Sequence, residues 1–159
     1  FGDDLLWKSL ISDGLQSNYT RFDMGDMILV KYDWVLVGDH PFFNETLYSK
    51  IQKVLPEPYV TSRIYFNRYK PGVDGCLHRD GVDLTALIYV SDYDKEFGGV
   101  TQFYENDLNQ IFVPPITNRL VIFDSEILHK GFGFSHQWNP HRITLAFKLK
   151  KDYNEENDN

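Results

Sequence analysis

Three residues of this chain have the types and spacing needed to bind one metal ion. His78 and Asp80 lie two positions apart, so in extended chain their side chains point to the same side. His129 follows the apolar run at 120–123, which predicts a strand that can deliver a third ligand. Two imidazoles and one carboxylate leave three positions of an octahedral ion open, which suits iron(II) oxygen chemistry. The pattern therefore predicts a non-haem iron centre that activates oxygen.

A fourth residue, Arg142, can hold an anion beside this metal. In the extended segment 142–147, Arg142 shares one face with Thr144 and Ala146, while the other face is apolar. An Arg and a Thr on an inner face are costly unless they are paired, and a bound dicarboxylate such as 2-oxoglutarate pairs both. The alternative is an Arg at the mouth of the strand, solvated or bridged to an acid. Spacing alone leaves both interpretations open.

The elements that must position these residues are mainly strands. Helical spacing predicts helices over 3–18 and over 44–55, the second capped by Asn44 with Val54 inward, and extended chain over 27–37. After Pro58, strands are predicted at 62–69, 84–91, 100–104, 120–124 and 142–150. Short strands separated by turn signals at 70–72, 98–99 and 139–140 favour a sandwich or jelly roll, with the helices packed outside it.

Length and composition predict a single globular domain. The 159 residues are 42% hydrophobic and 16% aromatic, which is enough to bury a core. We expect one domain over 1–151, with a helical and extended support region over 1–60 and the jelly-roll core over 61–151. The acidic segment 152–159 is predicted to be a disordered tail.

Charge and cysteine content narrow the environment and the partners. The net charge of −7 and the lack of a basic stripe argue against a nucleic-acid partner. Cys76 is the only cysteine, which fits a reducing, cytoplasmic compartment. No apolar run approaches the roughly 20 residues needed to span a bilayer, so no membrane partner is expected. Because the sequence begins at Phe1, a removed signal peptide stays an open alternative, as does the oligomeric state.

A series of short motifs between Arg63 and Lys150 gives the chain a family resemblance. In chain order these are NRYKPG (67–72), LHRD (77–80), LIYVS (87–91), GG (98–99), RLVIF (119–123), ILH (127–129) and HRIT (141–144). With this order and spacing the chain resembles the 2-oxoglutarate- and iron(II)-dependent dioxygenases, specifically their prolyl 4-hydroxylase-like branch. A His-x-Asp pair alone arises often by chance, so the series is far more specific than the pair.

The resemblance implies a double-stranded β-helix, a form of jelly roll, and a role for each site residue. His78, Asp80 and His129 would bind iron(II), and Arg142 would bind the far carboxylate of 2-oxoglutarate. Co-substrate contacts are implied for the residues that match the family's other positions, Tyr69, Tyr89 and Thr144. O₂ is the second co-substrate, and ascorbate is a candidate further cofactor. The implied reaction hydroxylates a C–H bond and releases succinate and CO₂.

The expected substrate is a prolyl residue of a peptide or protein, with Trp34 and Trp138 as apolar walls. His129 and Arg142 are further apart than the family often shows, which predicts a longer loop over 131–140. The alternatives are a small-molecule hydroxylase acting on a free amino acid, a nucleic-acid demethylase, and a jelly-roll binding module without turnover. The demethylase branch typically carries a second Arg where this strand has Lys148. His136 and His141 are not expected to bind the metal.

Overall fold

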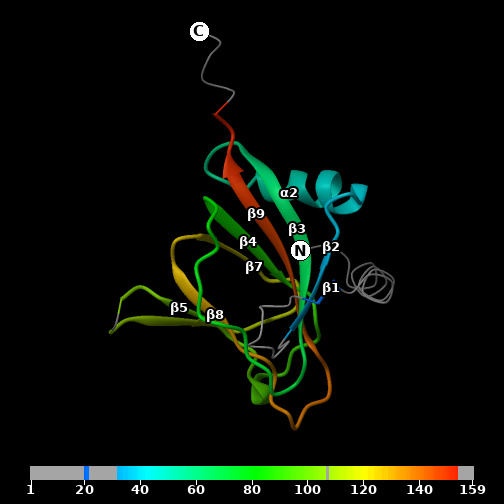
Figure 1. Cartoon of the computed structure of the whole chain (residues 1–159), viewed down its shortest axis with the longest axis vertical. Helices are drawn as coiled ribbons and strands as arrows, with labels where there is room; N and C mark the ends of the chain where they lie inside the picture. The colour runs from blue at the N-terminus through cyan, green and yellow to red at the C-terminus, as the bar shows by residue number, and fades with distance from the viewer. Residues whose placement is uncertain (1–19, 22–31, 107, 154–159) are drawn as a thin grey trace.

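Two antiparallel sheets form the body of the protein, in a computed structural model that describes residues 20–21, 32–106 and 108–153 (Figure 1). The six-stranded sheet has the order β1 (Thr20–Arg21), β2 (Tyr32–Leu36), β3 (Tyr59–Tyr69), β9 (Arg142–Lys151), β4 (Leu84–Tyr89) and β7 (Leu120–Asp124). The three-stranded sheet has the order β6 (Gln110–Val113), β5 (Thr101–Tyr104) and β8 (Leu128–Gly131). The helix predicted over 3–18 lies outside the described residues, as does part of the extended segment 27–37.

Strand β9 lies in the middle of the larger sheet, between β3 and β4 (Figure 1). In its antiparallel register with β3, Arg142 is opposite Tyr69 and Lys148 is opposite Arg63. Because side chains alternate along a strand, β9 sends two sets of side chains to opposite faces. Leu145, Phe147 and Leu149 enter the hydrophobic core. The set that starts with Arg142 faces the smaller sheet and lines the pocket between the two sheets. Arg142, Thr144 and Ala146 share this face, as the sequence predicted.

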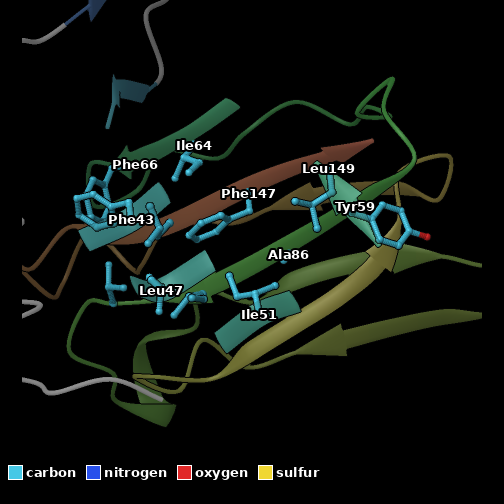
Figure 2. Close-up of a cluster of buried hydrophobic side chains, with 12 residues drawn as sticks. Phe43, Leu47, Ile51, Tyr59, Ile64, Phe66, Ala86, Phe147 and Leu149 are labelled. Atoms are coloured by element: carbon cyan, nitrogen blue, oxygen red, sulfur yellow. The ribbon is translucent and has the colours of Figure 1, made fainter. Parts of the chain in front are cut away.

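A short helical segment covers the core face of the larger sheet. It consists of a π-helical turn η1 (Phe42–Leu47) and helix α2 (Tyr48–Gln52). Its buried side chains pack on those of β3, β4 and β9 to form one cluster, part of which is labelled in Figure 2: Phe43, Leu47, Ile51, Ile64, Phe66, Ala86, Phe147 and Leu149. This cluster covers one face of the larger sheet, and the residues of the candidate site lie on the opposite face.

The second predicted helix is present but differs at both ends. It begins after Pro41, whose φ of −57° suits the start of a helix, and not at Asn44. The Asn44 amide instead donates a hydrogen bond of 2.7 Å to the Gly38 carbonyl. The helix ends at Gln52, so Val54 lies in a turn and is 59% exposed instead of buried.

The five strands predicted after Pro58 are confirmed, with β3 starting three residues earlier than expected. The sequence did not predict β6 or β8. Each has only four residues of mixed polarity, and each is held by pairing with β5. Within the described part of the chain, no helix has the length and apolar character to cross a membrane.

Candidate metal centre and anion pocket

His78, Asp80 and His129 bring three ligand atoms within 4.8 Å of one another. The Nε2 atom of His78 lies 3.3 Å from Oδ1 of Asp80, and Nε2 of His129 lies 3.5 Å from Oδ2. Two imidazole nitrogens and a carboxylate oxygen at these separations can share one metal ion. The grouping that the sequence pattern predicted is therefore present in space.

Backbone hydrogen bonds place the two histidines side by side. His78 and His129 form an isolated antiparallel bridge, in which each amide nitrogen donates to the other residue's carbonyl at 3.0 Å. The amide of Asp80 then donates to the Ser125 carbonyl at 2.9 Å. His129 follows β7, as the sequence predicted, and lies inside the next strand, β8 of the smaller sheet. The metal ligands thus join the loop after β3 to the second sheet.

Both imidazoles are fixed in the tautomer that a metal requires. Nδ1 of His78 is 2.8 Å from the Cys76 carbonyl, and Nδ1 of His129 is 2.8 Å from the Ile127 carbonyl. A carbonyl oxygen only accepts hydrogen bonds, so each Nδ1 carries the proton and donates it. Nε2 is then the ring atom that can give its lone pair to a metal ion, and in His78 without a metal it donates a hydrogen bond to Asp80. Such outer hydrogen bonds from Nδ1 are typical of metal-binding histidines.

Asp80 is held by two residues outside the predicted site, Lys148 and Thr85. Its Oδ2 forms an ion pair with Nζ of Lys148 and accepts a hydrogen bond of 2.6 Å from Oγ1 of Thr85. Both side chains of the ion pair are almost fully buried, at 3% and 4% exposure. Oδ2 is therefore occupied, and Oδ1 is the oxygen left free to bind a metal.

The charges of this cluster keep Asp80 ionised. Burial alone would raise the pKa of the Asp80 carboxyl, but His78, Lys148 and Thr85 together hold it well below its usual range. The hydrogen bond to Asp80 raises the pKa of His78, whereas burial lowers the pKa of His129. A neutral His129 and an ionised Asp80 are the protonation states that bind a metal ion.

Arg142 forms the back of the pocket between the two sheets. It is 2% exposed, and its Nε and Nη2 donate 2.7 Å hydrogen bonds to the Gly99 carbonyl and to Oγ1 of Thr101. Burial lowers its pKa, and the rings of Tyr69 and Tyr89 flank the guanidinium at 5.3 and 5.4 Å. No carboxylate of the described residues pairs with it. The solvated or acid-bridged alternative therefore does not apply within this part of the chain.

The third nitrogen of Arg142 faces a space that a glycine keeps open. A Cβ atom at Gly131 would lie 3.2 Å from Nη1 of Arg142 and 2.9 Å from the Tyr69 ring. Arg142 and the three candidate metal ligands His78, Asp80 and His129 line the same pocket. A buried cation and three candidate metal ligands thus line one cavity, which suits an acid that carries a second metal-binding group.

The other expected contact residues take different positions. Tyr69 and Thr144 line the pocket, and their contact with 2-oxoglutarate stays a prediction. Tyr89 is fully buried behind Arg142, and its hydroxyl donates a 2.7 Å hydrogen bond to Thr101. It therefore orients Thr101 and Arg142 from behind.

An outer pocket opens on the solvent side of the metal cluster, with a volume of about 220 Å³. Trp34 is one of its walls, as expected, at 6.1 Å from the ring of Tyr65. Trp138 is not among the residues that line it, and packs instead on Phe97 and Phe134 at 5.1 and 4.7 Å. His136 is exposed and outside the metal cluster.

Comparison with known proteins identifies the fold. No family model and no curated protein matches the sequence. Among solved structures, the chain is similar to a prolyl hydroxylase from Trichoplax adhaerens in complex with a hypoxia inducible factor peptide fragment, with a TM-score of 0.72 and 15% identity over 93% of this chain and 78% of the other. The chain has the fold of the 2-oxoglutarate–iron(II) oxygenases.

Two further structures show how widely this oxygenase fold is used. The viral collagen prolyl hydroxylase vCPH from Paramecium Bursaria Chlorella virus-1, in its 2-oxoglutarate complex, matches with a TM-score of 0.69 and 18% identity over 95% of this chain and 92% of the other. The non-heme alpha ketoglutarate dependent epimerase SnoN matches with a TM-score of 0.70 and 12% identity over 94% and 75%. At these identities the likeness establishes the oxygenase fold, and the chemistry has to be argued from the site.

Proposed function

We propose that the chain is a 2-oxoglutarate- and iron(II)-dependent oxygenase. The observation that carries this proposal is Arg142, a buried guanidinium without a carboxylate partner among the described residues, in the same pocket as the candidate metal ligands. Burying an unpaired charge is costly, so the pocket favours an anion at Nη1. A dicarboxylate places one end at Arg142 and presents the other to the metal. The chain would then be a single domain over 1–151, with a double-stranded β-helix over 61–151.

Each site residue has a part in this reaction. Bound iron(II) would supply the activation of O₂, coupled to oxidative decarboxylation of 2-oxoglutarate to succinate and CO₂. His78, Asp80 and His129 would hold the iron through Nε2, Oδ1 and Nε2. The rings of Phe103 and Phe123 pack at 5.8 and 4.8 Å from the His129 ring and exclude water from that side.

The residue proposed to be hydroxylated is a prolyl residue in a peptide or protein. Trp34 and Tyr65 form an aromatic corner in the outer pocket, directly beside His78 and Asp80. A proline ring has little to recognise except its apolar faces, and an aromatic corner packs against them. Likeness to a prolyl hydroxylase with a bound peptide supports this choice of substrate.

The test is incubation of the protein with iron(II), 2-oxoglutarate and O₂, with succinate and substrate mass both measured. The substrates compared are proline-containing peptides, free proline and methylated oligonucleotides. We expect a gain of one oxygen on the peptides, in step with succinate. Demethylated oligonucleotide or hydroxylated free proline, with untouched peptide, would replace the prolyl-peptide assignment by one of the alternatives.

Two variants separate the metal centre from general damage to the protein. Asp80→Ala removes the carboxylate ligand and should abolish both Mn(II) binding and turnover. His136→Ala removes an exposed imidazole next to Gly72, in the loop after β3 that carries His78 and Asp80. This variant should leave Mn(II) binding and turnover unchanged. Metal binding that survives in the first variant and fails in the second would refute the ligand assignment.

A further inference from the structure

The outer pocket carries more positive charge than the acidic chain as a whole. Arg63 and Arg79 both line it, and Asp80 is the only acidic residue in the described lining. The carboxylate of Asp80 is already neutralised by Lys148. A bound metal ion would add further positive charge at the same point. The chain as a whole has a net charge of −7, so a positively charged pocket stands out and favours an anionic ligand.

Arg63 is an exposed cation whose cross-strand neighbour is a second cation. In the β3–β9 register it is directly opposite Lys148, and like charges at such a pair repel. Both cations lie against one ring, with Tyr65 at 5.5 Å from the Arg63 guanidinium and at 5.9 Å from Nζ of Lys148. Lys148 has Asp80 as its partner, whereas no carboxylate of residues 32–106 or 108–153 forms an ion pair with Arg63.

Arg79 is the second arginine that lines the outer pocket. Its Nε donates a 2.8 Å hydrogen bond to the carbonyl of Glu126, which fixes the guanidinium while leaving its charge unpaired by any carboxylate in the described chain. The terminal nitrogens of Arg79 therefore stay available to a ligand. Guanidinium groups match carboxylates because both are planar and can form two parallel hydrogen bonds.

We propose that this outer pocket binds a carboxylate of the substrate, through Arg63 and Arg79. This proposal rests on the proposed function and specifies which class of peptide is hydroxylated. The preferred substrate is an acidic peptide, in which an Asp or Glu side chain, or a free C-terminal carboxylate, lies close to the hydroxylated prolyl residue. Trp34 and Tyr65 hold the ring of that residue while the arginines hold the acid.

The test compares peptides that differ only in charge. Acetylated and amidated peptides carry Asp, the isosteric Asn, or Lys beside the proline, and a fourth has neutral side chains and a free C-terminus. Binding is measured on the Mn(II) and 2-oxoglutarate protein without O₂, and kcat and KM are measured with iron(II). We expect an Asp or free-carboxylate peptide to bind about twofold to fivefold more tightly than the Asn peptide, since an exposed ion pair contributes up to about 1 kcal/mol.

The variants show whether the arginines are responsible. Arg63→Gln and Arg79→Gln should each weaken acidic-peptide binding and leave the Asn peptide unchanged, and Arg63→Glu should shift the preference toward the Lys peptide. Lys50→Gln removes the same charge from the exposed surface of α2 and serves as the control. A general structural defect would instead weaken all four peptides equally.

The outcomes separate this inference from the proposed function. Equal hydroxylation of acidic and neutral peptides, or an acidic preference that survives in both Gln variants, would overturn the inference and leave the oxygenase proposal standing. Binding of acidic peptides that depends on Arg63, without any hydroxylation, would support the inference and refute the prolyl hydroxylase assignment. If an oligonucleotide bound more tightly than every peptide, the assignment of an acidic peptide as the substrate would be wrong.

Discussion

Replacement of Lys148 by Met tests whether the buried ammonium stabilises the metal centre before any metal binds. The Lys148–Asp80 pair is 3% and 4% exposed, and breaking a buried pair costs about 3–5 kcal/mol because one charge is left alone. For a chain of this length 1 kcal/mol corresponds to roughly 2–4 °C. We therefore expect the metal-free Lys148→Met protein to unfold about 6–20 °C below the wild type.

A divalent metal should restore much of this loss, because it places positive charge on the carboxylate that the substitution leaves unpaired. The rise in Tm on addition of Mn(II) should therefore be larger in Lys148→Met than in the wild type. Lys151→Met is the matched control, since Lys151 is on the same strand but forms an exposed pair with Glu57, and exposed ion pairs contribute little to stability. Equal Tm values for the two metal-free variants, or equal rises with Mn(II), would refute the argument.

Two further predictions concern the co-substrate and pH. Arg142→Ala should raise the dissociation constant for 2-oxoglutarate at least about tenfold in calorimetric titration of the Mn(II) protein, with Mn(II) affinity unchanged. Arg142→Lys should recover only part of the 2-oxoglutarate affinity, because an ammonium lacks the planar fork of a guanidinium. A 2-oxoglutarate constant unchanged in the Ala variant would contradict the pocket assignment. Because the pKa of Asp80 is lower in the folded than in the unfolded protein, its stabilising contribution is present above about pH 4 and is lost on acidification. The difference in unfolding free energy between metal-free wild type and Asp80→Asn, measured in urea, should therefore shrink from about pH 5 toward pH 3, and a growing difference would reverse the assigned shift.

The residues that the sequence predicted are those whose geometry is local. His78 and Asp80 share a side because extended chain has a period of two, and the same rule put Arg142 and Thr144 on one face. Lys148 follows from that rule as well, since it is six positions after Arg142. It was interpreted only as the absence of a second Arg, although continuing the alternation to the end of the strand would have placed it in the site.

Other features could not be obtained from local patterns. The opposition of Arg63 to Lys148 depends on the register between β3 and β9, two strands separated by more than 70 positions in the sequence. The pairing of β8 with β5, which carries His129 into the second sheet, also depends on contacts between distant segments. Tyr89 was expected to contact the co-substrate, but it lies beside Arg142 and outside the lining of the pocket, because alternation along a strand does not tell whether a side chain lines a cavity or packs behind its wall.

The central place of β9 has a consequence for how the protein is made. A ribosome synthesises β3 and β4 long before β9, yet β9 separates them in the finished sheet. Until it arrives, each has an open edge of backbone hydrogen-bonding groups, of the kind that pairs with other chains. The same insertion brings in Arg142 and Lys148. Nascent chains therefore acquire their anion-binding residues and lose their aggregation-prone edges in one late step, so conditions that delay this step should cost yield and activity together.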